Sequence, residues 1–430
     1  MLLLTGAIVF PVPMGRRFDA RPEIPRRSDG TPVRASGWRR LRASVAALMI
    51  AVLVAVLVAV FSRGDGRHAN QGIVHFLGGA TPAFEPFIAN RDPSYGAFLR
   101  RHMWRMVVYS PHFDDKTRWY PNGWVYDDAY AIYPGSTLAV RHPNWILRDP
   151  TGRPLFIPYA CANGTCPAYA ADISNPAFRQ HWIADARAEL RHGYRGLFID
   201  NVNMELRVGN VNEQQVAPVD QATHRPMTYD AWRSYMALFM EEVRAALPHA
   251  EIVHNALWFA DSPTRTADPY IRQEIQAADY VNLERGVNEP GLSGGAGPAS
   301  LTSFLNYIDD VHALGKGVIL DGSATDRHGT EYSLAAYFLI SAGNDLVSAG
   351  GMTPIHWWTG FDVNLGEALG PRRRWSGVLR RDFTRGMSLV NEPGALSRAV
   401  KLPSPMRDLD GRIVESLVLA PASGVVLTRP

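Results

Sequence analysis

The segment Gly196–Asn203 constrains the fold more than any other part of the chain, because it has the sequence GLFIDNVN. Three apolar residues after a glycine predict a short strand that is buried on both faces, and such strands are typical of parallel sheets covered by helices. Asp200 ends this strand. If the sheet closes into a (β/α)₈ barrel, Asp200 lies at the face where the active sites of such barrels are built.

Further short apolar runs alternate with longer amphipathic runs, which is the pattern of repeated βα units. The eight candidate strands are Gly72–Leu77, Met106–Ser110, Ala170–Ile173, Gly196–Asn201, Glu251–Leu257, Tyr280–Glu284, Gly317–Asp321 and Leu346–Ala349. Eight is the number that closes a barrel of this type. Trp124–Tyr133 is an alternative segment that could supply another strand.

The candidate helices have recognisable starts. Pro176 follows two good capping residues and predicts a helix over Ala177–His192, where apolar residues recur at helical spacing. Thr228–Leu247 and Leu301–Leu314 have the same form, and each precedes a candidate strand by a short turn. This is the order expected for crossover helices.

The texture changes near the C-terminus, where β-prone runs become closely spaced and are separated by turn residues. The sequence therefore predicts an α/β fold: a (β/α)₈ TIM barrel over residues 71–375, followed by a small antiparallel, sandwich-like β domain over residues 376–430. A domain of that size is too small to be secure alone, so we expect it to pack on the barrel.

A single N-terminal transmembrane helix is predicted before the barrel. Residues 43–61 form an uncharged apolar segment of about the length that spans a bilayer. The arginine-rich leader over residues 1–42 predicts a cytoplasmic N-terminus. Residues 62–70 are a polar linker. We expect a signal anchor in a bacterial cell membrane with the barrel outside it; secretion after signal cleavage is the alternative, and Met14 is an alternative start.

The charge balance argues against a nucleic-acid partner. The chain has a formal net charge of +3, but the excess of basic residues lies in the leader and the remainder is slightly acidic. A nucleic-acid footprint needs a basic face. The only two cysteines, Cys161 and Cys166, could form a disulfide in an oxidising compartment, with two free thiols as the alternative.

Acidic residues end three of the candidate strands: Asp200, Glu284 and Asp321. Hydrolysis of a glycosidic bond needs two carboxyl groups that flank the bond, and acids at the ends of the fourth and sixth strands could face each other across a barrel mouth. Each of these acids could instead cap the helix that follows its strand.

Polar and aromatic side chains that suit a carbohydrate gather near the same predicted strand ends. Indole and phenol rings stack on the apolar faces of sugars, while amides and carboxylates bind the hydroxyl groups. The candidate substrate-binding residues are Tyr109, His112, Asp172, Asn201, Asn203, His254, Asn255, Trp258, Asp321, Trp357 and Trp358. For the tryptophans, ordinary core packing is an equally good interpretation.

Several motifs in order resemble the hypothetical glycosyl hydrolase family 15, a family related to the endo-α-1,4-polygalactosaminidase-like and α-galactosidase-like barrels. They are DISNPAF at 172–178, GLFIDNV at 196–202, NLE at 282–284, DVNLGEA at 362–368 and RRDFTRGMSLVN at 380–391. The resemblance covers roughly residues 72–430 and implies a TIM barrel acting on an oligo- or polysaccharide.

The resemblance also implies roles for two acids, with Asp200 as nucleophile and Glu284 as general acid/base. This chain has glutamate where the α-galactosidase-like barrels have aspartate, so the retaining outcome depends on the separation of the two carboxyl groups. A catalytically inactive carbohydrate-binding barrel in exopolysaccharide or envelope assembly is the alternative. We expect no cofactor and no metal, since His181 and His192 lack metal-ligand spacing.

Overall fold

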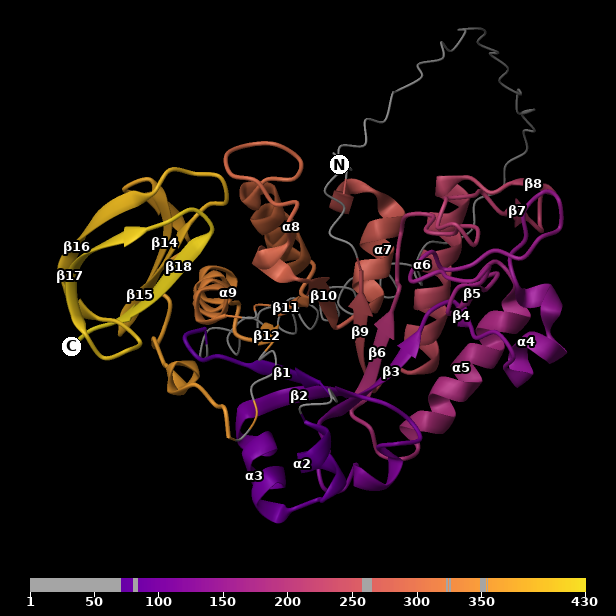
Figure 1. Ribbon diagram of the computed structural model, residues 1–430, viewed down its shortest axis with the longest axis horizontal. Coiled ribbons are helices and arrows are strands. Elements are labelled where there is room, and N and C mark those ends of the chain that lie inside the picture. The colour runs from indigo at the N-terminus through magenta and orange to yellow at the C-terminus, as the bar shows by residue number, and fades with distance from the viewer. Residues whose placement is uncertain are drawn as a thin grey trace, which may run out of the picture. The chain divides into compact units, whose positions relative to one another are not determined.

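The computed structural model describes residues 71–79, 84–256, 265–321, 324, 326–348, 353 and 355–430. Eight parallel strands form a closed barrel in the order β1-β12-β11-β10-β9-β6-β3-β2 (Figure 1). They are β1 (Phe76–Gly79), β2 (Met103–Val108), β3 (Gly123–Asp128), β6 (Gly196–Asp200), β9 (Glu251–Asn255), β10 (Tyr280–Glu284), β11 (Gly317–Asp321) and β12 (Leu346–Ser348). The barrel expected from the sequence is therefore present.

The third barrel strand is not the one predicted. Ala170–Ile173 does not join the barrel; β5 (Tyr169–Ala170) instead pairs antiparallel with the short β4 (Ala131–Ile132). The true third strand is β3, which overlaps the alternative segment Trp124–Tyr133. The prediction failed because β3 mixes apolar and polar residues, whereas Ala170–Ile173 is apolar apart from Asp172 and is buried in a connection outside the barrel.

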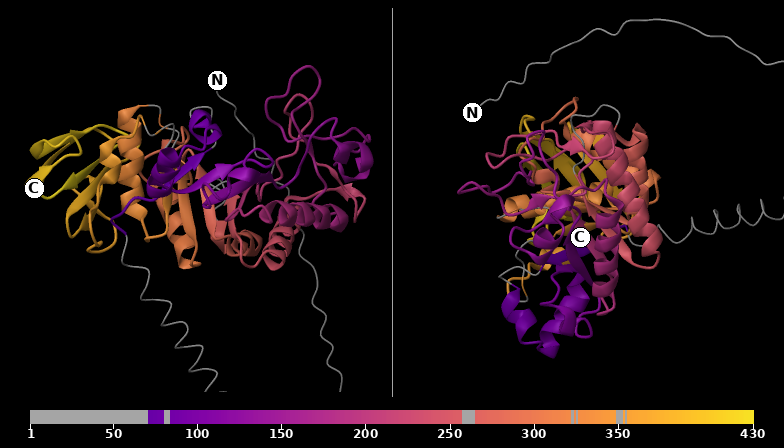
Figure 2. Two further views of the ribbon diagram at one scale, coloured as in Figure 1. Left: turned by 90° about the horizontal axis from the view of Figure 1, so that it is seen from below. Right: turned by 90° about the vertical axis from the view of Figure 1, so that its right-hand side faces the viewer.

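Helices surround the barrel and connect its strands (Figures 1 and 2). They are α2 (Glu85–Ala89), α3 (Pro93–His102), α4 (Thr137–Arg141), α5 (Pro176–Leu190), α6 (Tyr229–Ala246), α7 (Pro269–Ala277), α8 (Leu301–Ala313) and α9 (Arg327–Ile340). The capping signals act as expected: the side chains of Asn175, Thr228 and Ser300 each accept a hydrogen bond from a backbone N–H in the first turn of α5, α6 and α8.

The period of two along each strand sorts the barrel interior into layers. Seven residues, one on each of seven strands, form a buried apolar cluster inside the barrel: Leu77, Trp124, Phe198, Val253, Tyr280, Ile319 and Leu346. Two residues further along β6, β9 and β11, the same inward face carries Asp200, Asn255 and Asp321. The carboxyl end of the barrel is thus polar above an apolar plug.

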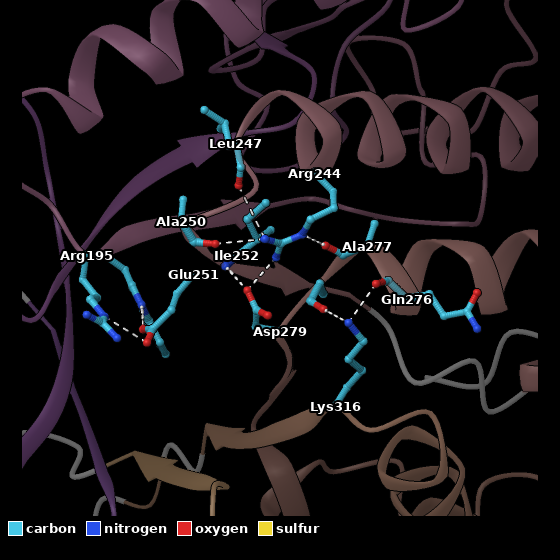
Figure 3. A network of polar contacts seen from close by, with 12 residues as sticks. Arg195, Arg244, Leu247, Ala250, Glu251, Ile252, Gln276, Ala277, Asp279 and Lys316 are labelled. Carbon is cyan, nitrogen blue, oxygen red and sulfur yellow. Dashed lines mark hydrogen bonds and ion pairs between the residues drawn. The ribbon is translucent and has the colours of Figure 1, made fainter. Parts of the chain in front are cut away.

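A polar network ties helices to the amino ends of the strands (Figure 3). Asp279 Oδ2 accepts hydrogen bonds from Arg244 Nη2 at 2.5 Å and from the Ile252 backbone N–H at 2.9 Å. The same guanidinium donates to the carbonyl oxygens of Ala250 and Ala277. These contacts pin α6 and α7 to β9 and β10, at the end opposite Asp200.

The C-terminal strands form one six-stranded sheet in the order β13-β14-β15-β18-β16-β17, not the sandwich that the sequence suggested (Figure 1, yellow). The strands are β13 (Arg373–Trp375), β14 (Val378–Phe383), β15 (Gly386–Asn391), β16 (Arg398–Arg407), β17 (Ile413–Leu419) and β18 (Ser423–Thr428). Val390 and Val426 join the main core beside α9, while their neighbours Leu389 and Leu427 form a second core on the other face. Both faces of the sheet are therefore used.

The leader, the apolar segment over residues 43–61 and the linker lie outside the described residues. Within the part of the chain that the structure describes, no helix combines the length and hydrophobicity needed to cross a bilayer.

Candidate active site

A cavity of about 270 Å³ opens at the carboxyl ends of the barrel strands. Strands β3, β6, β9 and β10 supply its floor, and the segments around 157–159 and 201–207 supply a wall. Its lining residues are Tyr126, Asp128, Ile157, Pro158, Tyr159, Asp200, Asn201, Asn203, Arg207, Asn255, Ala256 and Glu284. Three carboxyl groups and three amides therefore share one small space.

Asp200 is the most tightly held of these acids. Its Oδ2 accepts a hydrogen bond from the Tyr126 hydroxyl at 2.6 Å. Its Oδ1 accepts one from Asn255 Nδ2 at 2.7 Å and one from the Asn201 backbone N–H at 2.7 Å. Asn282 Nδ2 in turn donates to Asn255 Oδ1 at 2.9 Å, so a second layer of contacts orients the amide that holds Asp200. The carboxylate is fixed in direction before any substrate arrives.

Asn201 connects Asp200 to Asp128. Its backbone has φ +57°, in the left-handed region that asparagine tolerates better than most residues. This turn directs Asn201 Nδ2 to Asp128 Oδ2 at 2.6 Å, while Asp128 Oδ1 accepts from the Tyr130 N–H at 2.9 Å. Burial raises the pKa of Asp128 to about 7, and the charge of Asp200 acts in the same direction.

Glu284 stands at the end of β10, on the exposed rim of the same cavity. Partial desolvation by the cavity wall raises the pKa of Glu284, and the negative charges of Asp200 and Asp321 add to this effect. The positive charges of Arg285 and Arg207 oppose it. Glu284 therefore holds its proton to higher pH than an isolated glutamate, as a general acid requires.

Five of the residues predicted from the sequence lie together in the cavity: Asp200, Glu284, Asn201, Asn203 and Asn255. Two others lie beside it. Asp321 is paired in register with Glu284 on the neighbouring strand β11, and the ring centroid of Tyr109 lies 5.2 Å from that of Tyr126.

His254 does not reach the cavity. It precedes Asn255 on β9, so the alternation of the strand turns it outward, where it is fully buried against α7. Its Nδ1 lies 2.6 Å from Glu274 Oε1. His112 also points elsewhere, with Nε2 at 3.0 Å from Glu85 Oε1. The predicted substrate contact of the fully buried His254 was wrong, whereas that of His112, which is exposed outside the cavity lining, stays a prediction.

Asp172 has a local structural role instead of a place at a strand end. Its Oδ1 accepts hydrogen bonds from the backbone N–H of Ser174 at 3.0 Å and from its hydroxyl at 2.5 Å, in the turn that leads into α5. Because Ala170–Ile173 is not a barrel strand, Asp172 is not carried to the cavity mouth.

The tryptophans after β12 are also away from the cavity. Trp357 packs among the rings of Phe76, Phe98 and His102, beside a second cavity of about 200 Å³ near the starts of β1 and β2. Trp358 lies under the guanidinium of Arg327, with the guanidinium carbon 3.6 Å from the ring centroid. Core packing was the better interpretation of both, and Trp258 lies outside the described residues.

The sequence interpretation missed Tyr126, Asp128, Tyr159 and Arg207. A signal existed for the first two: in Trp124–Asp128 every second residue faces the interior, so correct assignment of β3 places Tyr126 and Asp128 near the mouth. Tyr159 and Arg207 come from irregular connections, for which the sequence has no comparable period.

Cys161 and Cys166 are joined by a disulfide bond. The bonded loop follows directly after Ile157, Pro158 and Tyr159, which line the cavity. The Cys161 backbone N–H also donates to Glu213 Oε1 at 2.8 Å, so the loop is fastened to the connection that follows β6.

A parallel eight-stranded barrel with several acids in a polar cavity at the carboxyl ends of its strands is the arrangement of a barrel enzyme. Residues 112–387 match the model described as "Hypothetical glycosyl hydrolase family 15", and the chain belongs to that family. The resemblance noted in the sequence is thereby confirmed, and the protein is a glycoside hydrolase.

Among curated proteins, none matches the chain. Solved structures similar to it include the glycoside hydrolase domain of PelA from Pseudomonas aeruginosa, with 15% identity, coverage of 69% of this chain and 97% of that chain, and a TM-score of 0.38. The isomalto-dextranase of Arthrobacter globiformis T6 shares 15% identity over 85% of this chain and 75% of that chain, with a TM-score of 0.42. An α-galactosidase from Thermus thermophilus shares 14% identity over 73% and 66%, with a TM-score of 0.43.

Proposed function

We propose that this glycoside hydrolase cleaves glycosidic bonds within an oligo- or polysaccharide, with Asp200 as nucleophile and Glu284 as general acid/base. The observation that carries the proposal is that both carboxyl groups line one cavity, where Glu284 has a raised pKa and Asp200 is held by three hydrogen-bond donors. One acid is thus suited to donate a proton and the other to attack.

The chemistry proceeds in two displacements. Asp200 attacks the anomeric carbon while Glu284 protonates the glycosidic oxygen, so the leaving sugar departs as an alcohol and a glycosyl ester forms on Asp200. Water then attacks the anomeric carbon of that ester, and the Glu284 carboxylate takes the proton from the water. The Asp200 carboxylate is released, Glu284 is protonated again, and the anomeric configuration is retained.

We further propose that the catalytic domain lies outside the cytoplasmic membrane, held by a signal anchor over residues 43–61, and that its substrate is an extracytoplasmic polysaccharide. The uncharged apolar segment after an arginine-rich leader supports the anchor. The Cys161–Cys166 bond supports an oxidising compartment. Cell fractionation tests the anchor, and protease added to intact spheroplasts tests the side: digestion of the barrel only after lysis would contradict this location.

Substitution of the two acids tests the catalytic roles. The wild type is first screened against galactose-containing and amino-sugar polymers, with products identified by mass. We expect Asp200→Asn and Glu284→Gln each to lower kcat by at least about a hundredfold. Asp172→Asn is the matched control, because Asp172 is a buried aspartate outside the cavity. Retention of activity in both acid variants would refute the assignment.

The stereochemistry has its own test. Proton NMR of the product formed in the first seconds of reaction reports its anomeric configuration before mutarotation. Retention supports Asp200 as nucleophile. Inversion would instead make Asp200 the base that activates water. A wild type that binds a polymer but yields no product would favour a non-catalytic carbohydrate-binding barrel.

A further inference from the structure

Exposed aromatic side chains concentrate at one side of the cavity mouth. Among the described residues, the exposed side chains of phenylalanine, tryptophan and tyrosine number four, all of them tyrosines: Tyr109 (47% exposed), Tyr133 (53%), Tyr159 (46%) and Tyr229 (51%). The first two follow the neighbouring strands β2 and β3 in the chain, and the third follows in the same connection after β3. All three are therefore carried by connections on the β2–β3 side of the barrel mouth.

Tyr159 lines the cavity directly. Tyr109 lies against Tyr126, with ring centroids 5.2 Å apart, and the Tyr126 hydroxyl donates to Asp200. Tyr133 directly follows β4 and lies three residues after Tyr130, whose backbone N–H donates to Asp128 Oδ1 at 2.9 Å. Burial raises the pKa of Tyr133, and the charge of Asp128 and the Tyr159 hydroxyl add to this effect. The three phenol rings are therefore carried by the connections that surround the β2–β3 side of the cavity.

The cavity is too small for a carbohydrate chain. Its volume of about 270 Å³ lies below the range of roughly 300–1,000 Å³ that is typical of pockets for drug-sized ligands. A substrate of several sugar units must therefore extend beyond the cavity, over whatever surface adjoins it. An exposed phenol ring provides an apolar face for a pyranose ring and a hydroxyl for its polar edge.

The connection that carries Tyr159 is well fastened. The Tyr159 N–H donates to the Ile157 carbonyl at 2.9 Å, and the disulfide-bonded loop begins two residues later. Phe156 and Gly209 exchange backbone hydrogen bonds at 2.9 Å, which joins this connection to the one that follows β6. Figure 2 shows both connections projecting from the barrel, in magenta. Little ordering is left to occur when a ligand binds.

We propose that Tyr109, Tyr133 and Tyr159 form an aromatic border that binds the sugar units adjoining the cleaved bond, so that the substrate is a carbohydrate chain running from the acids across the β2–β3 side of the mouth. This inference rests on the proposed function, because it takes Asp200 and Glu284 to mark the cleaved bond. The border then selects chains over single sugars, while Asp200 and Glu284 perform the cleavage.

Binding to an inactive variant tests the border without any hydrolysis. Full-length Asp200→Asn in detergent is run in native gels containing dextran, pullulan, chitosan or a galactan, and the retarding polymer is then titrated calorimetrically as oligosaccharides of one to six units. We expect affinity to rise with length up to at least three units. Tyr133→Ala and Tyr159→Ala, each added to Asp200→Asn, weaken binding of the longer oligosaccharides by roughly threefold to tenfold.

Tyr229→Ala, added to the same background, is the matched control, because Tyr229 is equally exposed but begins α6, outside the connections that follow β2 and β3. Binding that is unchanged in the Tyr133 and Tyr159 variants would overturn the proposal, as would retardation by none of the polymers or affinity independent of oligosaccharide length. If the tyrosine substitutions weaken binding but Asp200→Asn and Glu284→Gln remain active in hydrolysis, the aromatic border is supported and the catalytic assignment is refuted.

Discussion

Asp128 and Asp200 stand directly opposite each other in register on the neighbouring strands β3 and β6. Asn201 bridges the pair, because its side-chain amide donates to Asp128 while its backbone N–H donates to Asp200. Burial raises the pKa of Asp128 to about 7, and the nearby negative charge of Asp200 adds to this effect.

Asp128→Asn should therefore change the pH dependence of the reaction as well as its rate. The amide leaves one oxygen to accept from both the Tyr130 N–H and Asn201, so the bridge to Asp200 loosens. We expect kcat to fall roughly tenfold to a hundredfold with little change in KM. An inflection of kcat near pH 7 in the wild type should disappear.

The pH profile of kcat measured between pH 4 and 9 checks this expectation. Asp172→Asn serves as the control, since its hydrogen bonds to Ser174 lie outside the cavity. That variant should keep the wild-type profile even if it is less stable. An Asp128→Asn enzyme with the wild-type inflection would show that Asp128 does not titrate in the reaction.

The barrel and the main acids were predictable because their signals are local. Asp200 and Glu284 each end a short, largely apolar run that is typical of a buried strand, and strand ends in a parallel barrel converge on one face. The wrong assignment of the third strand also changed the predicted site. Because Ala170–Ile173 was taken as the strand in place of β3, Tyr126 and Asp128 were left out of the candidate residues and Asp172 was included wrongly.

Other errors concerned which side of a strand a residue occupies and where the long connections place their side chains. His254 and Asn255 are adjacent on β9, so the period of two puts one of them inside the barrel and the other outside. Which of the two points inward is decided only by the register with the neighbouring strands. Trp357 follows β12 in the chain but lies near the starts of β1 and β2, because its connection leaves the mouth. Long connections have no sequence periodicity from which the position of a side chain can be predicted.

The alkaline limit of activity should follow the charges around Glu284. In its proposed role as general acid, Glu284 must be protonated, so activity should be lost as pH rises through its pKa, which lies above the ordinary value of 4.5. Asp321→Asn removes a negative charge that raises this pKa, so the alkaline limb should move to lower pH. Arg207→Gln removes a positive charge that lowers it, so the limb should move to higher pH.

These opposite shifts are measured as the alkaline midpoint of kcat/KM at low ionic strength, where charge effects are largest. Added salt should reduce both shifts. If both variants move the midpoint in the same direction, the alkaline limb belongs to another group.

Tyr126→Phe removes the hydroxyl that donates to Asp200 Oδ2 at 2.6 Å without changing the ring. A charge-assisted hydrogen bond of this length both orients the carboxylate and stabilises its charge. We expect kcat to fall roughly tenfold, and the rates at which the glycosyl intermediate forms and breaks down to change as well. Tyr235→Phe is the control, because Tyr235 makes the same kind of contact with Asp220 outside the cavity. Equal effects of the two substitutions on kcat would remove any special role for Tyr126.

Glu251 should matter for stability and not for catalysis. At the amino end of β9 it accepts hydrogen bonds from Arg105 at 2.6 and 2.7 Å and from Trp124 at 2.9 Å. Burial opposes its ionisation, but the hydrogen bonds and charge of Arg105 outweigh burial and lower the pKa of Glu251. Because the folded pKa is lowered, this stabilisation is present above about pH 4.5 and is lost as pH falls through the folded value.

Glu251→Gln leaves the buried Arg105 guanidinium without a charged partner, which should lower the free energy of unfolding by about 3 kcal/mol at pH 7. The loss should shrink as pH falls below 4.5, since the wild type then loses the same interaction. Urea unfolding at pH 7 and pH 4 measures both effects. Arg412→Gln, in an exposed ion pair, should leave stability unchanged. An undiminished difference at low pH would mean that packing, and not the charge of Glu251, holds this end of the barrel.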